Sequence, residues 1–216
     1  MGVLFFLLSL QLQVTAGWTP LAAGTAMLPV TLIMLALSSR SGDLATRIGA
    51  RLPLTIGPMA IALGMLLMTR IDADASFVVD VLPATIVFGL GLALIVAPLT
   101  STALGAVPDE RVGAASGVNN AVARTAGLLS VAAIPGLVGL TGDALSDPSR
   151  LGPGFDRAMV VSAVIVALAG AAAFLLLPRT SVSADRCTRH EERIVHRPCP
   201  VDGSSSAVET PVVIGK

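Results

Sequence analysis

The feature that most constrains this chain is a series of long apolar runs, separated by short stretches that hold most of the charged residues. Several runs approach or exceed the roughly 18 to 20 residues that a helix needs to cross about 30 Å of hydrocarbon. One signal peptide cannot explain so many runs. Of the 216 residues, 54% are hydrophobic and 13% are charged, whereas soluble domains carry about 25% charged residues. The pattern predicts an all-α integral membrane protein.

The apolar runs predict a bundle of six transmembrane helices. We expect them within residues 2–14, 21–37, 52–69, 77–107, 114–140 and 158–177, and the first is short for a span. The runs are continuously apolar, whereas strands of a membrane barrel alternate polar and apolar residues. Residues 1–179 are therefore expected to form one six-helix membrane domain. Residues 180–216 lack apolar periodicity, so we predict a disordered tail.

Basic residues predict the orientation in the membrane. Ten fall on one side of the predicted spans: Arg40, Arg47, Arg51, Arg111, Arg179, Arg186, Arg189, Arg193, Arg197 and Lys216. The opposite side carries three, namely Arg70, Arg150 and Arg157. Cytoplasmic loops carry the excess of Lys and Arg. We therefore expect a multi-pass protein of the cell (plasma) membrane with both termini in the cytoplasm.

The connection between the second and third predicted helices combines glycines with charges. Gly42 and Gly49 permit turns and close helix approach. Asp43 and Arg47 are four residues apart, a spacing that allows pairing on one helical turn. The alternative is that these arginines, with Arg51, only set the topology. From the chemistry alone the two interpretations are about equally supported.

Polar residues inside the predicted spans are candidates for function. Arg124 and Asn120 are four apart and share one face of the fifth helix, with Asn119 adjacent. A guanidinium inside a bilayer costs about 2.5 kcal/mol or more unless it is paired or hydrated. Arg124 is therefore expected to line a transport path, contact another helix, or snorkel to the surface. Gln13 is a candidate for the path or for a polar contact between helices.

Small residues in the predicted helices favour close helix packing. Gly64 in the third predicted helix and Gly89 and Gly91 in the fourth are expected at helix contacts or bends.

The inventory of titratable residues restricts the chemistry. Apart from Asp80, which stands near the outer end of its run, the predicted spans hold no carboxylate that could carry a proton. Both histidines lie in the tail, so a membrane-embedded enzyme is not predicted. Cys187, His190, His196 and Cys199 are spaced superficially like a zinc site, but no core surrounds them and we predict no metal. The net charge is zero and no nucleotide-binding loop is present, so neither nucleic acid nor ATP is an expected partner.

Several motifs, in order along the chain, resemble one family of transporters. They are the run LQVTAGWTPLAAG at residues 12–24 with Leu28 and Pro29 after it, the segment 42–51, Ala97 to Thr100, Val107 and Pro108 through Arg111, and Ala115 to Asn120 with Arg124. Together they resemble the fourteen-span drug:proton antiporter family of the major facilitator superfamily. Segment 42–51 is similar to the C-domain copy of its G-x-L-a-x-R-x-G-x-R motif, with Thr46 where an acidic residue is usual.

The resemblance implies that this chain corresponds to the C-terminal half of such an exporter. It implies export of amphipathic small molecules with the proton gradient as the driving force and no cofactor. The expected partners are the lipid bilayer and an N-terminal half-transporter, or a second copy, because transport in this superfamily needs two six-helix bundles. The alternative is a membrane interaction subunit, or an inactive remnant, that pairs with a separate half-transporter.

Overall fold

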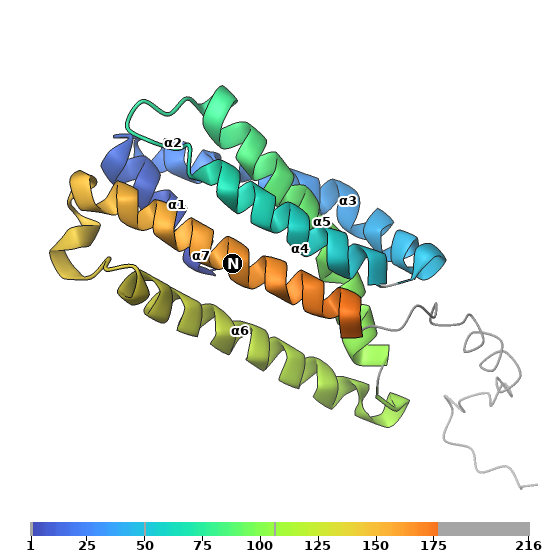
Figure 1. The fold of residues 1–216 in the computed structure, drawn as a ribbon. Helices are drawn as coiled ribbons and strands as arrows, with labels where there is room; N and C mark the ends of the chain where they lie inside the picture. The colour runs from blue at the N-terminus through green and yellow to red at the C-terminus, as the bar shows by residue number, and fades with distance from the viewer. Residues whose placement is uncertain (1, 50, 106, 177–216) are drawn as a thin grey trace, which may run out of the picture. The chain divides into compact units, whose positions relative to one another are not determined.

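The computed structural model describes residues 2–49, 51–105 and 107–176, and these residues form helices and short connections with no strand. Figure 1 shows the longer helices running side by side in a bundle. The predicted tail, residues 180–216, lies outside the described residues.

The helices follow in this order along the chain. They are α1 (Gly2–Leu10), which continues into a π-helical turn η1 (Gln11–Thr15), α2 (Pro20–Thr25), α3 (Leu28–Ile48), α4 (Arg51–Met68), η2 (Phe77–Val81) leading into α5 (Leu82–Gly105), η3 (Asp109–Arg111) leading into α6 (Val112–Leu137), η4 (Gly142–Leu145) and α7 (Pro148–Leu176).

Four helical stretches among the described residues are long and apolar enough to cross a membrane. They are Pro20–Ser38, Arg51–Met68, Phe77–Gly105 and Pro148–Leu176. The stretch Gly2–Thr15 is apolar but shorter. Helix α6 has 26 residues, yet it is not among the four, since two asparagines and Arg124 lower its hydropathy. The all-helical membrane fold is confirmed, and the count of six spans stays a prediction.

Two predicted boundaries were wrong. The last helix begins at Pro148 rather than near residue 158, because Asp147 caps its start and polar residues continue as helix before the apolar run. The predicted helix 21–37 is divided between α2 and α3. Thr19 caps α2 by accepting a hydrogen bond from the Ala22 N–H at 3.3 Å, with Pro20 in the first turn.

Glycines bring α4 and α5 into close contact, as predicted for Gly64 and Gly91. A Cβ atom at Gly64 would lie 2.7 Å from the backbone nitrogen of Phe88. A Cβ at Gly91 would lie 2.6 Å from the carbonyl oxygen of Gly57. Because these neighbours are backbone atoms, only glycine allows the two helices to approach this closely. Helices α3 and α7 pack against the same pair, so α4 and α5 form the centre of the bundle.

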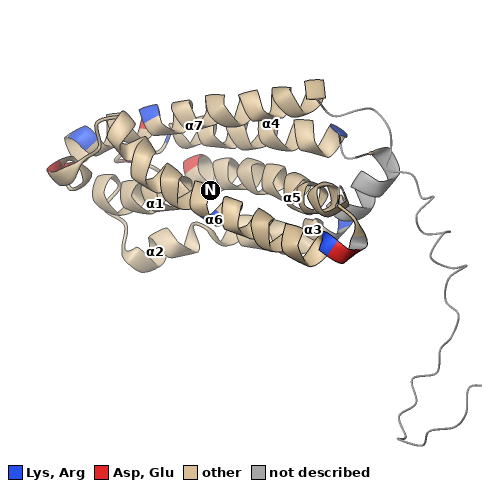
Figure 2. Cartoon of the chain, turned by 90° about the horizontal axis from the view of Figure 1, so that it is seen from below, with Lys and Arg blue, Asp and Glu red and all other residues tan. Residues whose placement is uncertain are grey.

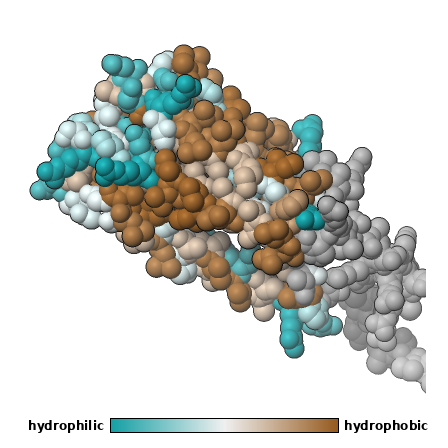
Figure 3. Space-filling model, in the orientation of Figure 1, coloured by the Kyte–Doolittle hydropathy of each residue, from teal (hydrophilic) through white to brown (hydrophobic). Residues whose placement is uncertain are grey.

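The surface fits a lipid environment. Figure 2 shows the charged residues gathered mainly toward the two ends of the helices, and Figure 3 shows a broad hydrophobic surface between more hydrophilic parts. Large apolar side chains point outward along this surface, including Leu32, Leu63 and Leu168. Exposed apolar patches of this extent mark a surface covered by something other than water.

Candidate transport path and helix contacts

Helix α6 carries the predicted polar cluster, and the structure brings two of its members together. The Arg124 Nε donates a hydrogen bond to the Asn120 Oδ1 at 3.3 Å. Both side chains are exposed, while Asn119 is half-buried. Among the described residues no ion pair involves Arg124. The two side chains share one face of α6, as the i,i+4 spacing predicts. Within the described part of the chain no acidic side chain compensates the guanidinium charge.

Most of α6 is not covered by the other described residues of the chain. Its buried residues are Ile134 and Pro135, close to its C-terminal end. Toward its N-terminal end a Cβ at Gly113 or Gly117 would meet no atom within 4 Å. The polar cluster therefore lies on a stretch of helix that the rest of the described chain does not cover.

The glutamines of η1 differ in environment. Gln13 is half-buried and its Nε2 donates to Ser9 of the same helix, to the carbonyl oxygen at 3.1 Å and to Oγ at 2.9 Å. Gln11 is 1% exposed, and its Nε2 donates to the Ile71 carbonyl oxygen at 2.8 Å. Gln11 joins η1 to the connection after α4, whereas the described hydrogen bonds of Gln13 stay within its own helix.

The expected cytoplasmic loop is mostly helix. Helix α3 includes Gly42, Asp43 and Arg47 and runs to Ile48, so the prediction of a tight loop over residues 42–51 was wrong. The side chains of residues 42–48 lie outside the described set, and the predicted pair of Asp43 and Arg47 is not tested. Gly49 ends the helix with φ 83° and ψ 154°, a conformation essentially restricted to glycine.

Arg51 attaches the start of α4 to the end of α7. Its Nε donates to the Phe174 carbonyl oxygen at 2.9 Å. The guanidinium carbon also lies 4.2 Å from the centre of the Phe174 ring, a cation–π geometry. A carbonyl in the last turn of a helix lacks an intrahelical donor, and a basic side chain there is favourable. This motif residue therefore has a structural role that its position in the sequence did not reveal.

Two apolar cavities occur in the described bundle. One, of about 720 Å³, opens between α2, α3 and the η2–α5 helix and is lined by Trp18, Thr19, Ala22, Thr25, Leu28, Pro29, Leu32, Phe77 and Leu82. The other, of about 400 Å³, lies between α4, α5 and α7 and is lined by Leu54, Pro58, Ile61, Met65, Phe88, Ile95, Leu99, Ile165, Val166, Ala169 and Ala173. No charged side chain lines either cavity, so each suits an apolar occupant.

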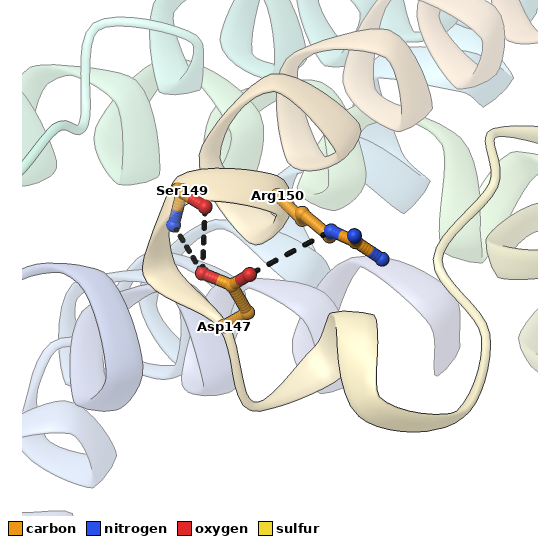
Figure 4. Close-up of polar contacts among 3 residues, drawn as sticks. All are labelled: Asp147, Ser149 and Arg150. Carbon is orange, nitrogen blue, oxygen red and sulfur yellow. Dashed lines mark hydrogen bonds and ion pairs between the residues drawn. The ribbon is translucent and has the colours of Figure 1, made fainter.

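The described carboxylates mostly belong to helix ends. The Asp80 Oδ2 accepts a hydrogen bond from the Ser76 N–H at 2.8 Å at the start of η2. The Asp147 Oδ1 accepts from the Ser149 hydroxyl at 2.7 Å and from the Ser149 N–H at 3.0 Å, and its Oδ2 lies 3.6 Å from the Arg150 Nε (Figure 4). The pKa of Asp147 is lowered chiefly by the hydrogen bond from the Ser149 hydroxyl, then by the bond from the Ser149 N–H and by the Arg150 charge.

Metal-ligating groups do not cluster in the described part of the chain, where no three His, Cys, Asp or Glu residues come together. The Cys and His residues of the tail lie outside it.

These observations define a class of protein: a multi-helix membrane protein whose described polar groups lie at helix ends, at helix contacts and on one helix, α6, that the described chain leaves largely uncovered. The chain belongs to the Major Facilitator Superfamily, whose profile matches residues 1–132. The family is one of membrane transporters.

Several relatives bear names of resistance or export proteins. The chain is 37% identical over 110 residues to "Multidrug resistance protein Stp" of Mycobacterium tuberculosis. The matched region covers 51% of this chain and 20% of that protein. It is 33% identical over 132 residues to "Puromycin resistance protein pur8" of Streptomyces alboniger, covering 60% of this chain and 26% of the relative. It is 28% identical over 164 residues to "Cephamycin export protein CmcT" of Amycolatopsis lactamdurans, covering 75% and 33%.

The chain therefore spans between a fifth and a third of the length of these relatives. No solved structure shows significant similarity to it.

Proposed function

We propose that this chain is the C-terminal six-span domain of a proton-coupled exporter of amphipathic drugs, and that it works with an N-terminal half. Family membership and the export and resistance roles of the relatives support the substrate class. The observation that carries the need for a partner is α6, which presents Arg124 and Asn120 without cover. Transport in this superfamily uses a path between two bundles, and one bundle forms only one wall of it.

In this proposal the four long apolar helices, the Gly2–Thr15 stretch and α6 are the six spans. The termini lie in the cytoplasm, and the proton gradient drives export without a cofactor. Arg124, Asn120, Asn119 and Gln13 are the candidates for the transport path or for inter-helix contacts. The excess of Lys and Arg on the side that carries Arg40, Arg51 and Arg111 supports the orientation.

Ethidium efflux from energised cells tests the function. We expect no efflux from cells that express this chain alone. Coexpression with the N-terminal half of the Mycobacterium tuberculosis relative is expected to give efflux that a proton uncoupler abolishes and that Arg124→Ala reduces. Arg40→Ala is a matched control, because among the described contacts the Arg40 guanidinium donates to the Ala36 carbonyl of its own helix.

Other outcomes separate the alternatives. Uncoupler-sensitive efflux from the chain alone would show that it does not need a second half. Correct membrane insertion and pairing without efflux would favour an interaction subunit or an inactive remnant.

A further inference from the structure

The larger apolar cavity, of about 720 Å³, is built mainly from a motif to which the proposed function assigns no role. The motif is the run at residues 12–24 with Leu28 and Pro29 after it. It supplies most of the residues that line the cavity, namely Trp18, Thr19, Ala22, Leu28 and Pro29. Thr25 and Leu32 of the same stretch, with Phe77 and Leu82 of the η2–α5 helix, complete the lining.

Two aromatic rings stand at this cavity. The centres of the Trp18 and Phe77 rings lie 6.4 Å apart, with 52° between the ring planes. Phe77 is 37% exposed and Trp18 is half-buried, so the described chain leaves part of each residue uncovered. Aromatic faces stack on planar ligands and attract cations, with Trp the strongest. The rings therefore favour a planar aromatic ligand over a flexible aliphatic one.

Thr25, another lining residue, offers hydrogen-bond acceptors. Its hydroxyl donates its proton to the Ala22 carbonyl oxygen at 2.8 Å, which leaves the lone pairs of the Thr25 Oγ1 as acceptors. Pro29 has no N–H, so the Thr25 carbonyl lacks the donor that the residue four positions later supplies in a regular helix. A ligand with N–H groups complements these acceptors, whereas a hydrocarbon chain offers them no donor.

The charge next to the cavity favours a cation. Phe77 belongs to segment 70–81, which carries one basic residue, Arg70, and three acidic ones, Asp72, Asp74 and Asp80. An excess of carboxylates raises the local concentration of cations and repels anions. No charged side chain lines the cavity itself, so we expect the carboxylates to attract a ligand at a distance rather than to pair with it.

We propose that this cavity binds a planar aromatic cation with N–H groups, which stacks on Trp18 and Phe77 and donates to Thr25. The volume lies within the range of about 300 to 1,000 Å³ that is typical of ligand pockets. The proposal rests on the proposed function for the class of amphipathic substrate, and it adds a site within this chain. Arg124 and Asn120 take no part in it, since neither lines the cavity.

Ethidium titration tests the site. Ethidium is a planar aromatic cation with two amino groups, and Trp18 is the only tryptophan of the chain, so its fluorescence reports on the cavity. With the full chain in nanodiscs of zwitterionic phosphatidylcholine, we expect quenching of Trp18 that saturates as ethidium is added. The anionic aromatic probe anilinonaphthalene sulfonate should not displace ethidium. Displacement at similar concentrations would overturn the assignment of a cation.

Matched variants test the named residues. Phe77→Leu removes the ring and keeps an apolar side chain, so the Kd for ethidium should rise about five- to tenfold. Thr25→Val removes the hydroxyl acceptor and keeps the shape, and the Kd should rise about threefold. The controls are Phe6→Leu, at a residue that is 42% exposed on α1, and Thr69→Val, whose hydroxyl donates to the Leu66 carbonyl oxygen at 2.7 Å.

Neither control residue lines the cavity, so both control variants should bind ethidium as the unaltered chain does. Equal Kd values in all four variants would overturn the proposal.

The other occupants give distinct results. Quenching that rises with ethidium without saturation would mean that the probe only partitions into lipid, and the proposal would be wrong. Saturable binding that appears only at a high protein-to-lipid ratio would mean that a second copy of the chain completes the site. Loss of binding when the N-terminal half of the Mycobacterium tuberculosis relative is coexpressed would mean that a partner helix fills the cavity. Either of these results would equally overturn the proposal.

Binding and transport can fail separately in these experiments. Saturable binding without efflux from any coexpressed pair would retain the site and remove the proposed exporter. Uncoupler-sensitive efflux of ethidium, with no binding to this chain alone, would retain the exporter and place its drug site elsewhere, which overturns the proposal.

Discussion

Helices α4 and α6 are both long helices of the bundle, but they differ in how much of each is buried against the rest of the described chain. Helix α4 has 18 residues, nine of them buried, and packs against α5 and α7. Helix α6 has 26 residues, of which two are buried. Within the described chain one helix is the centre of the bundle and the other is attached mainly where it meets α1. Within the described chain, α4 is therefore packed against its neighbours, whereas most of α6 is left uncovered.

The composition of the two helices explains the contrast. Helix α4 uses glycines at positions where the backbone of α5 comes within contact distance. Helix α6 also has glycines, but Gly113 and Gly117 meet nothing within 4 Å, and its polar residues lower its hydropathy. Small residues allow close helix contact only when a partner helix is present. Within the described chain, Gly113 and Gly117 therefore take part in no such contact.

The same substitution in the two helices should have opposite effects, and this is the largest difference we predict. Gly64→Ala places a Cβ 2.7 Å from the Phe88 nitrogen and 2.8 Å from its Cα. Because backbone atoms must shift, the free energy of unfolding should fall by about 1 to 3 kcal/mol. Gly117→Ala meets no atom and should raise helix stability by up to about 1 kcal/mol.

Thermal melting of each purified variant in the same detergent measures the comparison. Equal destabilisation by both alanines would mean that α6 is packed within this chain after all. Stabilisation by Gly64→Ala would contradict the close approach of α4 and α5.

How far the sequence predicted these two regions depends on the range of the interactions. Helix α4 was predicted at 52–69 and is observed at Arg51–Met68, since an apolar run bounded by charges is a local signal. The start of α7 and the end of α3 were missed, because polar residues there continue the helix beyond the apolar run. Hydropathy indicates which residues lie in the membrane, and it does not mark where the helical backbone begins or ends.

The candidate site shows the same division. That Asn120 and Arg124 share one helix face follows from their i,i+4 spacing and was predicted, and their role in transport stays a prediction. The Arg51–Phe174 contact joins residues 123 positions apart, and the cavity of about 400 Å³ is lined by residues of α4, α5 and α7. No local pattern contains either one, so both required the structure.

The contact of Arg51 with Phe174, which joins the start of α4 to the end of α7, provides the next test of how α4 is packed. Arg51→Gln removes the cation–π contact with the Phe174 ring and the charged donor to its carbonyl. We expect a loss of about 1 to 2 kcal/mol in the free energy of unfolding. Arg40→Gln is the control: its guanidinium donates to Ala36 of its own helix, so the change should stay within about 0.5 kcal/mol.

Denaturation of both variants in mixed micelles gives this difference. If Arg51→Gln is as stable as Arg40→Gln, the attachment of α4 to the end of α7 contributes nothing. The packing of α4 would then rest on its other contacts with α5 and α7.

The helix starts offer the smallest and most specific comparison. Asp147 caps the start of α7, whereas Arg111 precedes α6 without any side-chain cap. Hydrogen bonds from Ser149 and the Arg150 charge lower the pKa of Asp147 below its usual 3.8. A carboxylate with a lowered folded-state pKa adds stability above its unfolded pKa, and this contribution is lost as pH falls through the folded-state value.

The Asp147→Asn variant should therefore melt slightly below the unaltered chain at neutral pH, and the two curves should converge as pH falls below 3.8. Ser149→Ala should reproduce part of the effect, because it removes the hydroxyl hydrogen bond, which is the largest cause of the lowered pKa, and leaves the Asp147 carboxylate and the Arg150 charge in place. Melting temperatures collected from neutral pH downward measure both variants. A difference that persists unchanged at the lowest pH would show that the carboxylate charge is not what stabilises the start of α7. Helices α6 and α7 would then differ in stability through their packing, and not through a charged side chain at the helix start.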